Sequence, residues 1–194
     1  MSRLPSLSYD QLDADGQRVW DHIVDTRGDR VILPGGEGLS GPFNALVTAP
    51  HIGGHLSALG ATLRFNGTLP DVLRELAICV VAGHWQAEFE WAAHSRLARE
   101  LGVPDTVLDA IAQGGEPEFA DDAQRTVYTV ARQLVQTGRV TPETDKAVRQ
   151  LLGGSGTVEL VSLCGYYCAV AFSLNTFDVP LPPGVQPTWE DADA

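Results

Sequence analysis

Two glutamates and a histidine stand in a segment that is otherwise built for burial. The stretch from Arg74 to Ser95 reads RELAICVVAGHWQAEFEWAAHS and contains Glu75, Glu90 and His94. Acidic side chains seldom lie among so many apolar residues without a partner. Residues four apart lie on one face of a helix, so we expect Glu90 and His94 on the same face, with Glu90 one turn earlier. The spacing predicts a carboxylate–imidazole pair in which Glu90 orients His94 for general acid–base chemistry.

Glu75 lies on the preceding predicted helix and could join this cluster as a second carboxylate. It reaches Glu90 and His94 if the two helices pack antiparallel across the bend at Gly83 and His84. A purely structural hydrogen bond inside a helix pair would show the same pattern. Glu90 and His94 also have the spacing of two metal ligands, but a zinc site needs three or four, and only His84 offers a third. We therefore predict no metal and no cofactor.

The three cysteines do not form a recognisable redox motif. Cys79, Cys164 and Cys168 contain no C-x-x-C pair, and an odd number argues against a secreted disulfide framework. Cys164 and Cys168 stand one helical turn apart, which aligns their side chains poorly for a disulfide. Packing of small, polarizable side chains is the favoured interpretation.

Several residues could line a substrate pocket beside the cluster. The aromatic candidates are Trp85, Phe89, Trp91, Tyr166 and Tyr167. Among these we expect Trp85 and Tyr166 to contact substrate, with Asn175 further along the same helix as Tyr166. Arg64 and Arg74 could hold a substrate carboxylate through a bidentate contact. The alternatives remain open: aromatic residues at helical spacing are often plain core, and Arg74 could pair with a nearby acid.

The periodicity predicts an all-α protein of about eight helices, because strand-like alternation is hard to find in the sequence. The expected helices cover residues 13–25, 42–48, 51–65, 70–83, 86–101, 104–112, 121–138 and 158–177, with a further helix starting at Thr141 and a break at the GGSG of residues 153–156. The pair Gly53 and Gly54, between His51 and His55, would permit close approach by another helix or subunit.

Composition limits the class of protein and its partners. The chain has 194 residues, of which 44% are hydrophobic, as expected for a single globular domain. Its formal net charge of −12 argues against nucleic acid and anionic membranes as partners. The longest apolar run, residues 160–174, is shorter than the roughly 20 residues that span a bilayer, and predicts a buried helix. No signal peptide is evident at the N-terminus, so we expect a cytoplasmic protein.

Three blocks in order along the chain resemble the carboxymuconolactone decarboxylase family, which includes the AhpD-like alkylhydroperoxidases. They are PFNALVTAPHIGGHLSALGATLRF, RELAI with EFEWAAH, and ELVSLCGYYCAVAFSLNTFDVPLP, within residues 40–182. The resemblance implies an AhpD-like helical bundle that assembles as a homo-oligomer, such as a dimer, trimer or hexamer. It divides the chain into an arm at residues 1–41, the family domain at 42–182 and an acidic, proline-rich tail at 183–194. We expect that tail to be extended or disordered unless a neighbouring subunit holds it.

The resemblance also bears on the reaction. The family's peroxidases use the pattern E-x11-C-x2-C-x3-H, onto which Glu75 and His94 fall, while Ala87 and Glu90 occupy the two cysteine positions. Peroxidase activity is therefore the less favoured expectation, because its nucleophile is a thiolate. The decarboxylase branch is similar to this chain in keeping a histidine without the dithiol. It implies a lyase or isomerase acting on a small lactone or carboxylic acid; the alternative is a non-catalytic helical binding or assembly module.

Overall fold

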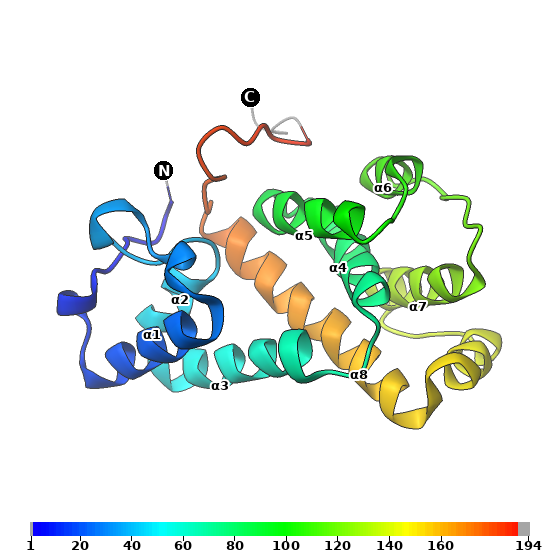
Figure 1. The fold of residues 1–194 in the computed structure, drawn as a ribbon, viewed down its shortest axis with the longest axis horizontal. Coiled ribbons are helices and arrows are strands. Elements are labelled where there is room, and N and C mark those ends of the chain that lie inside the picture. Colours follow the sequence, from blue (N-terminus) through cyan, green and yellow to red (C-terminus); the bar gives the residue numbers. More distant parts are fainter. Residues whose placement is uncertain (1, 190–194) are drawn as a thin grey trace. The chain divides into compact units, whose positions relative to one another are not determined.

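The computed structural model describes residues 2–189 and shows an all-α protein (Figure 1). The helices are α1 (Ala14–Arg27), α2 (Phe43–Thr48), α3 (Pro50–Ala61), α4 (Asp71–Trp85), α5 (Glu88–Glu100), α6 (Asp105–Ala112), α7 (Asp122–Thr137) and α8 (Pro142–Thr176). Within the described range, extended pairing is confined to one bridge between Ile32 and Leu39. The predicted fold class and the approximate number of helices are confirmed.

The chain forms two compact units. The first comprises residues 1–67 and 173–180, and the second comprises residues 68–172 and 181–194. Helix α8 contributes to both units, since it ends at Thr176. The division predicted from the sequence, at residues 41 and 182, stays a prediction.

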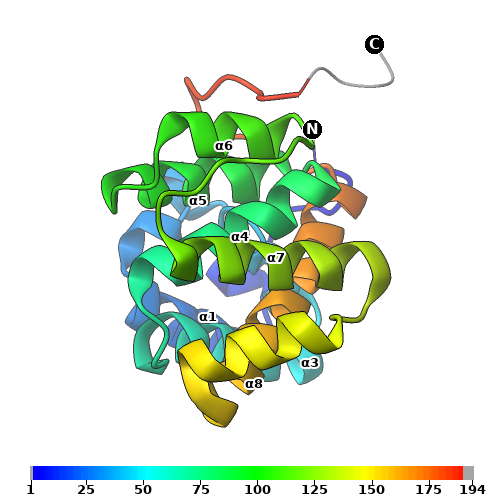
Figure 2. The same cartoon turned by 90° about the vertical axis from the view of Figure 1, so that its right-hand side faces the viewer.

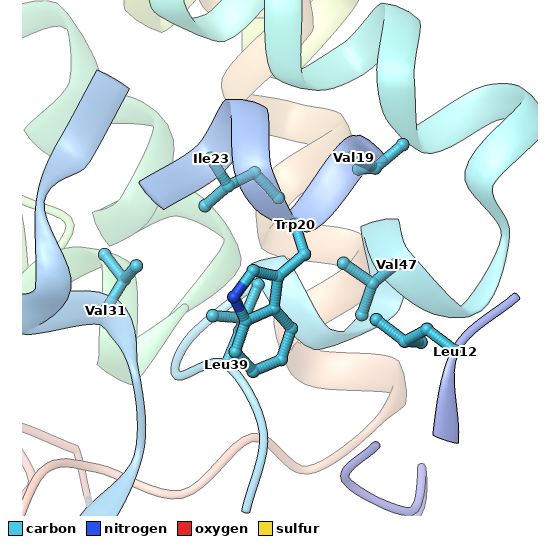
Figure 3. Close-up of a cluster of buried hydrophobic side chains, with 7 residues drawn as sticks. All are labelled: Leu12, Val19, Trp20, Ile23, Val31, Leu39 and Val47. Atoms are coloured by element: carbon cyan, nitrogen blue, oxygen red, sulfur yellow. The ribbon is translucent and has the colours of Figure 1, made fainter. Parts of the chain in front are cut away.

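In the first unit, α1 and α2 supply the centre of a small apolar core (Figure 3). Its buried members are Leu12, Val19, Trp20, Ile23, Val31, Leu39 and Val47. The indole of Trp20 lies between Leu39 and Val47 in Figure 3, so one large aromatic ring joins helix and loop. Burying such a ring provides much of the contact area of a small core.

The two glycines of α3 allow the close helix approach that the sequence suggested. A Cβ added at Gly53 would lie 1.9 Å from the carbonyl oxygen of Leu46 in α2. One added at Gly54 would lie 3.5 Å from a methyl group of Val19 in α1. Gly53 is therefore required sterically, whereas an alanine at Gly54 would make ordinary contact.

In the second unit, α4 is the central helix, and α5, α6 and α7 pack against it. Figure 2 shows α7 in front of α4, with α5 and α6 above these helices and the first part of α8 below them. Every residue from Leu73 to Ala82 is buried, which agrees with the nearly continuous apolar sequence of this helix. A helix that is apolar on all sides belongs inside a protein. Glu75 is carried into the interior by this helix.

Most helix ends are where the residue types predict them. The Asp121 side chain accepts hydrogen bonds from the backbone N–H groups of Ala123 and Gln124 at the start of α7. Gly138 ends the same helix in the left-handed conformation, with φ of 70°. The predicted break after residue 153 is a kink inside α8, where Gly153 has φ of 69° and ψ of −177°.

The start of α5 differs from the prediction. Gln86 takes the left-handed conformation with φ of 47°, and the helix begins at Glu88 instead of residue 86. Ala87 precedes the helix and donates its backbone N–H to the carbonyl oxygen of Ala82 at 2.9 Å. Consequently Glu90 lies in the first turn of α5, close to its junction with α4.

The tail up to Trp189 is held by its own chain, which corrects the expectation that another subunit would be needed. The backbone N–H groups of Thr188 and Trp189 donate to the Glu88 carboxylate at 2.7–3.0 Å. The indole N–H of Trp189 donates to the carbonyl oxygen of Ala112 at 2.9 Å. Its ring also meets that of Trp91 edge-on, with centroids 5.3 Å apart. The remaining tail residues, 190–194, lie outside the described range.

Helix α8 is long and apolar enough to cross a membrane by length and composition. Its most apolar window has a mean hydropathy of 1.5, and 44% of that window is buried inside the protein. A single helix of this kind is weak evidence for a membrane span, because the core helix of a soluble protein has the same properties.

Candidate active site

A buried carboxylate–imidazole pair joins α4 to α5. The Oε2 atom of Glu75 lies 2.6 Å from Nδ1 of His94, the distance of a strong, charge-assisted hydrogen bond. Only 1% of the Glu75 surface and 7% of the His94 surface are exposed. The partner of His94 is therefore Glu75, and the prediction that Glu90 orients the imidazole is wrong.

Arg74 supports the other oxygen of Glu75. Its Nε atom lies 3.4 Å from Oε1 of Glu75, and its Nη1 atom lies 2.8 Å from Oδ1 of Asp71. The guanidinium group is thus held by two acids of its own helix, as the alternative interpretation had it. In this position Arg74 places positive charge beside the Glu75 carboxylate and fixes its orientation.

Glu90 is buried without a hydrogen-bond partner. Its side chain is 2% exposed, and neither carboxyl oxygen has a hydrogen-bond partner among the described residues. Burial raises the pKa of Glu90 well above its ordinary value of 4.5, because the charged form loses its hydration. Burial therefore favours the uncharged, protonated form of this group, which can donate a hydrogen bond.

The cysteines beside the cluster are thiols, not thiolates. Burial raises the pKa of Cys164 to about 12, and raises that of Cys79 well above its ordinary value. Burial likewise raises the pKa of Cys168, an effect opposed by the Trp85 Nε1–H, which donates to its Sγ at 3.4 Å. Glu90 raises the pKa of both Cys79 and Cys168, which places its carboxyl within electrostatic reach of α4 and α8.

The aromatic residue against the imidazole is Tyr167. Its ring meets that of His94 edge-on with centroids 5.0 Å apart. Tyr166, which the sequence favoured for a pocket, is buried and packs on Tyr167 at 5.3 Å. Its role in substrate binding stays a prediction.

The other predicted binding residues are distributed differently. Trp85, at the end of α4, packs edge-on against Phe172 with centroids 4.8 Å apart. Arg64 and Asn175 belong to the first unit. The guanidinium group of Arg64 lies 5.8 Å from the ring centroid of Phe65, and Asn175 is exposed near the end of α8. Their roles in substrate binding stay predictions.

Among the described residues, no group of three or more histidine, cysteine or acidic side chains is arranged to hold a metal ion. His84, the third ligand considered for a metal, is exposed and meets the Trp85 ring edge-on at 4.6 Å.

Comparisons with known proteins agree with this architecture. Residues 50–133 match the model of the carboxymuconolactone decarboxylase family. A solved structure of similar fold is the alkylhydroperoxidase AhpD core of an uncharacterized peroxidase-related protein from Ralstonia eutropha JMP134. It is 16% identical, with a TM-score of 0.69 over 94% of this chain and 93% of that chain.

The debrominase Bmp8 is similar at the same level of structure. Its apo form is 10% identical, with a TM-score of 0.69 over 93% of this chain and 92% of that one. A cysteine-to-alanine variant of Bmp8 with bound 2,3,4-tribromopyrrole is 11% identical, again with a TM-score of 0.69, over 93% and 91% of the two chains. At these identities the likeness establishes the fold. No curated protein matches the chain.

The chain is thus an all-α protein of the AhpD-like fold with a buried Glu75–His94 pair. Its segment from residue 50 to residue 133 is the part that matches the model of the carboxymuconolactone decarboxylase family. That segment contains Glu75, Glu90 and His94.

Proposed function

We propose that this protein is a lyase or isomerase that acts on a small lactone or carboxylic acid by proton transfer. The observation that carries the proposal is the 2.6 Å contact between Glu75 and His94. A carboxylate on Nδ1 fixes the tautomer of an imidazole and supports the positive charge that forms when the ring accepts a proton. This is the arrangement of a general acid–base catalyst.

The family match suggests carboxymuconolactone as the first substrate to test. In its decarboxylation, the bond to the departing carboxylate breaks, and the electron pair passes through the conjugated ring to the lactone carbonyl oxygen. A proton is then added to the carbon next to that carbonyl, which gives the enol-lactone and carbon dioxide. His94, supported by Glu75, would manage that proton.

Peroxidase chemistry has little support in the site. Ala87 and Glu90 occupy the positions of the family's redox cysteines, and burial raises the pKa of all three cysteines present. A peroxidase needs a thiolate that can attack the peroxide.

A second candidate function is a non-catalytic binding or assembly module. The observation in its favour is the burial of the cluster, since no member of the set Glu75, Glu90 and His94 exposes more than 7% of its surface. A structural hydrogen bond between two helices would have the same geometry.

Turnover measurements separate the two functions. Purified protein is assayed with carboxymuconolactone, beside H94A, E75Q and the control E100Q, whose surface carboxylate pairs with Arg96. The enzymatic proposal expects wild-type and E100Q turnover to agree, with a loss of about 100-fold or more in H94A. Equal rates in wild type and H94A would refute the assigned role of His94. A folded wild-type protein without turnover would favour the module.

A further inference from the structure

The buried carboxyl group of Glu90 differs from that of Glu75 in its hydrogen bonding. Glu75 has both oxygens engaged, by His94 and by Arg74. Glu90 is equally buried, yet both of its oxygens lack a hydrogen-bond partner among residues 2–189. A buried polar group without a partner lowers stability, because its hydration is lost and nothing replaces it.

The groups around Glu90 offer it no salt bridge in the protein itself. Glu75 and Cys79 lie on α4, Cys168 lies on α8, and His94 follows one turn later on α5. Both thiols lie within electrostatic reach of the Glu90 carboxyl, since a charge on it would raise the pKa of each. His94 is engaged by Glu75 through Nδ1. The Glu90 carboxyl is thus buried with no hydrogen-bond partner among the described residues, which favours its uncharged form.

The position of Glu90 links it to the acid–base pair. It lies on the same face of α5 as His94, one turn toward the helix start. Arg74 and Glu75 bring fixed charges to the adjoining face of α4. A molecule that contacted the Glu90 carboxyl would therefore lie within reach of the imidazole.

We propose that Glu90, as a neutral carboxylic acid, is a substrate-binding group that donates a hydrogen bond to an anionic oxygen of the substrate, either a carboxylate or the enolate oxygen formed during reaction. The substrate supplies the hydrogen-bond acceptor that the described residues of the protein do not provide for Glu90. The carboxylate or enolate oxygen of a small organic acid provides the acceptor that the Glu90 O–H needs. This inference rests on the proposed function and specifies the substrate of the same site.

In this role, the buried Glu90 carboxyl lowers the stability of the free protein and strengthens the binding of the substrate. Removing a buried polar group that has no partner, and replacing it with an apolar side chain of similar size, stabilises a protein or leaves its stability unchanged. A structural carboxyl would behave in the opposite way. Binding and melting measured on the same variants therefore distinguish the two roles.

The experiment uses the full chain as wild type, E90L, E90Q and the matched control E100Q on the exposed face of the same helix. The probe is muconolactone, a small lactone with one carboxylate, titrated by calorimetry at pH 7. Melting temperatures are measured without ligand.

We expect E90L to bind muconolactone at least 10-fold more weakly than wild type, while its melting temperature is unchanged or rises by about 2–8 °C. E90Q should bind within a few-fold of wild type, because its amide N–H still donates, and E100Q should match wild type. Absence of muconolactone binding to wild type, or equal binding by E90L, would overturn the proposal. A lower melting temperature of E90L would show a structural role and overturn it as well.

Binding and melting are measured separately from turnover, so the two proposals can fail separately. Binding that depends on Glu90 in a protein without lyase or isomerase activity would refute the proposed function and leave the binding site standing. Turnover that E90L retains in full would refute the role of Glu90 and leave the acid–base pair standing.

Discussion

His94 Nδ1 and Glu75 Oε2 lie 2.6 Å apart across the α4–α5 junction, although the two residues are 19 positions apart in the sequence. The contact fixes one helix against the other at the point where the buried acid Glu90 also lies. It accounts for how two charged residue types are tolerated inside an apolar helix pair, since each satisfies the other.

The first prediction concerns stability of the free protein. E75L removes the partner of a buried imidazole and should lower the free energy of unfolding by about 1–3 kcal/mol. E90L should leave it unchanged or raise it, because no hydrogen bond is lost. Urea denaturation of both variants beside wild type measures the difference. The account fails if the two substitutions shift the urea midpoint in the same direction by similar amounts.

A second prediction concerns pH. Burial raises the pKa of Glu90 in the folded state above its ordinary value of 4.5. At a pH between these two values the folded protein holds a proton that the unfolded chain has released. The free energy of unfolding therefore falls as pH rises through this window, by up to about 1.4 kcal/mol per pH unit for this group.

E90Q removes that proton and its pH dependence. Urea midpoints at about pH 5, 6 and 7 should therefore fall more steeply for wild type than for E90Q. Below the ordinary value the acid is protonated in both states, and the two curves should run parallel. Parallel curves over the whole range would show that Glu90 is not held in its neutral form.

The thiols give a third prediction. Because burial raises the pKa of Cys164 to about 12 and also that of Cys79 and Cys168, all three should react slowly with iodoacetamide in the native protein at pH 7. Unfolding in urea should expose them to rapid modification. Hydroperoxide consumption with a dithiol donor should be negligible in wild type. Substantial consumption that C164S abolishes would contradict the assignment of these residues as inert.

The docked tail gives a fourth prediction. W189A removes the ring contact with Trp91 and the hydrogen bond to Ala112, and should lower the free energy of unfolding by about 1–2 kcal/mol, since the ring is only partly buried. W189F keeps an aromatic ring and should lose less. Thermal melts and proteolysis of the tail measure the effect. A tail that is cleaved equally fast in wild type and W189A would show that Trp189 does not hold it.

Local sequence signals determined the helices well. The acid at residue 121, the glycine at residue 138 and the Gly-rich break near residue 153 each act through backbone geometry that the residue type dictates. The apolar sequence of α4 likewise indicated a central helix. These features depend on neighbours in the chain, which a single sequence displays.

The partner of His94 was not determined by such signals. The spacing of Glu90 and His94 on one helix is real, but the left-handed Gln86 delays the start of α5 and places Glu90 in its first turn. Which carboxyl meets the imidazole then depends on how α4 packs against α5. Trp189 packs on Trp91, although the two residues are nearly a hundred positions apart in the chain. The residues around Trp189 in the sequence do not indicate which part of the protein it contacts.

The most direct test of the acid–base account is turnover of carboxymuconolactone in deuterium oxide, followed by mass spectrometry of the product. Proton transfer by His94 to the carbon next to the lactone carbonyl predicts one deuterium at that carbon in wild type. It also predicts a rate reduced about 100-fold or more in H94Q. Product without solvent deuterium, or an H94Q variant that reacts at the wild-type rate, would contradict the account.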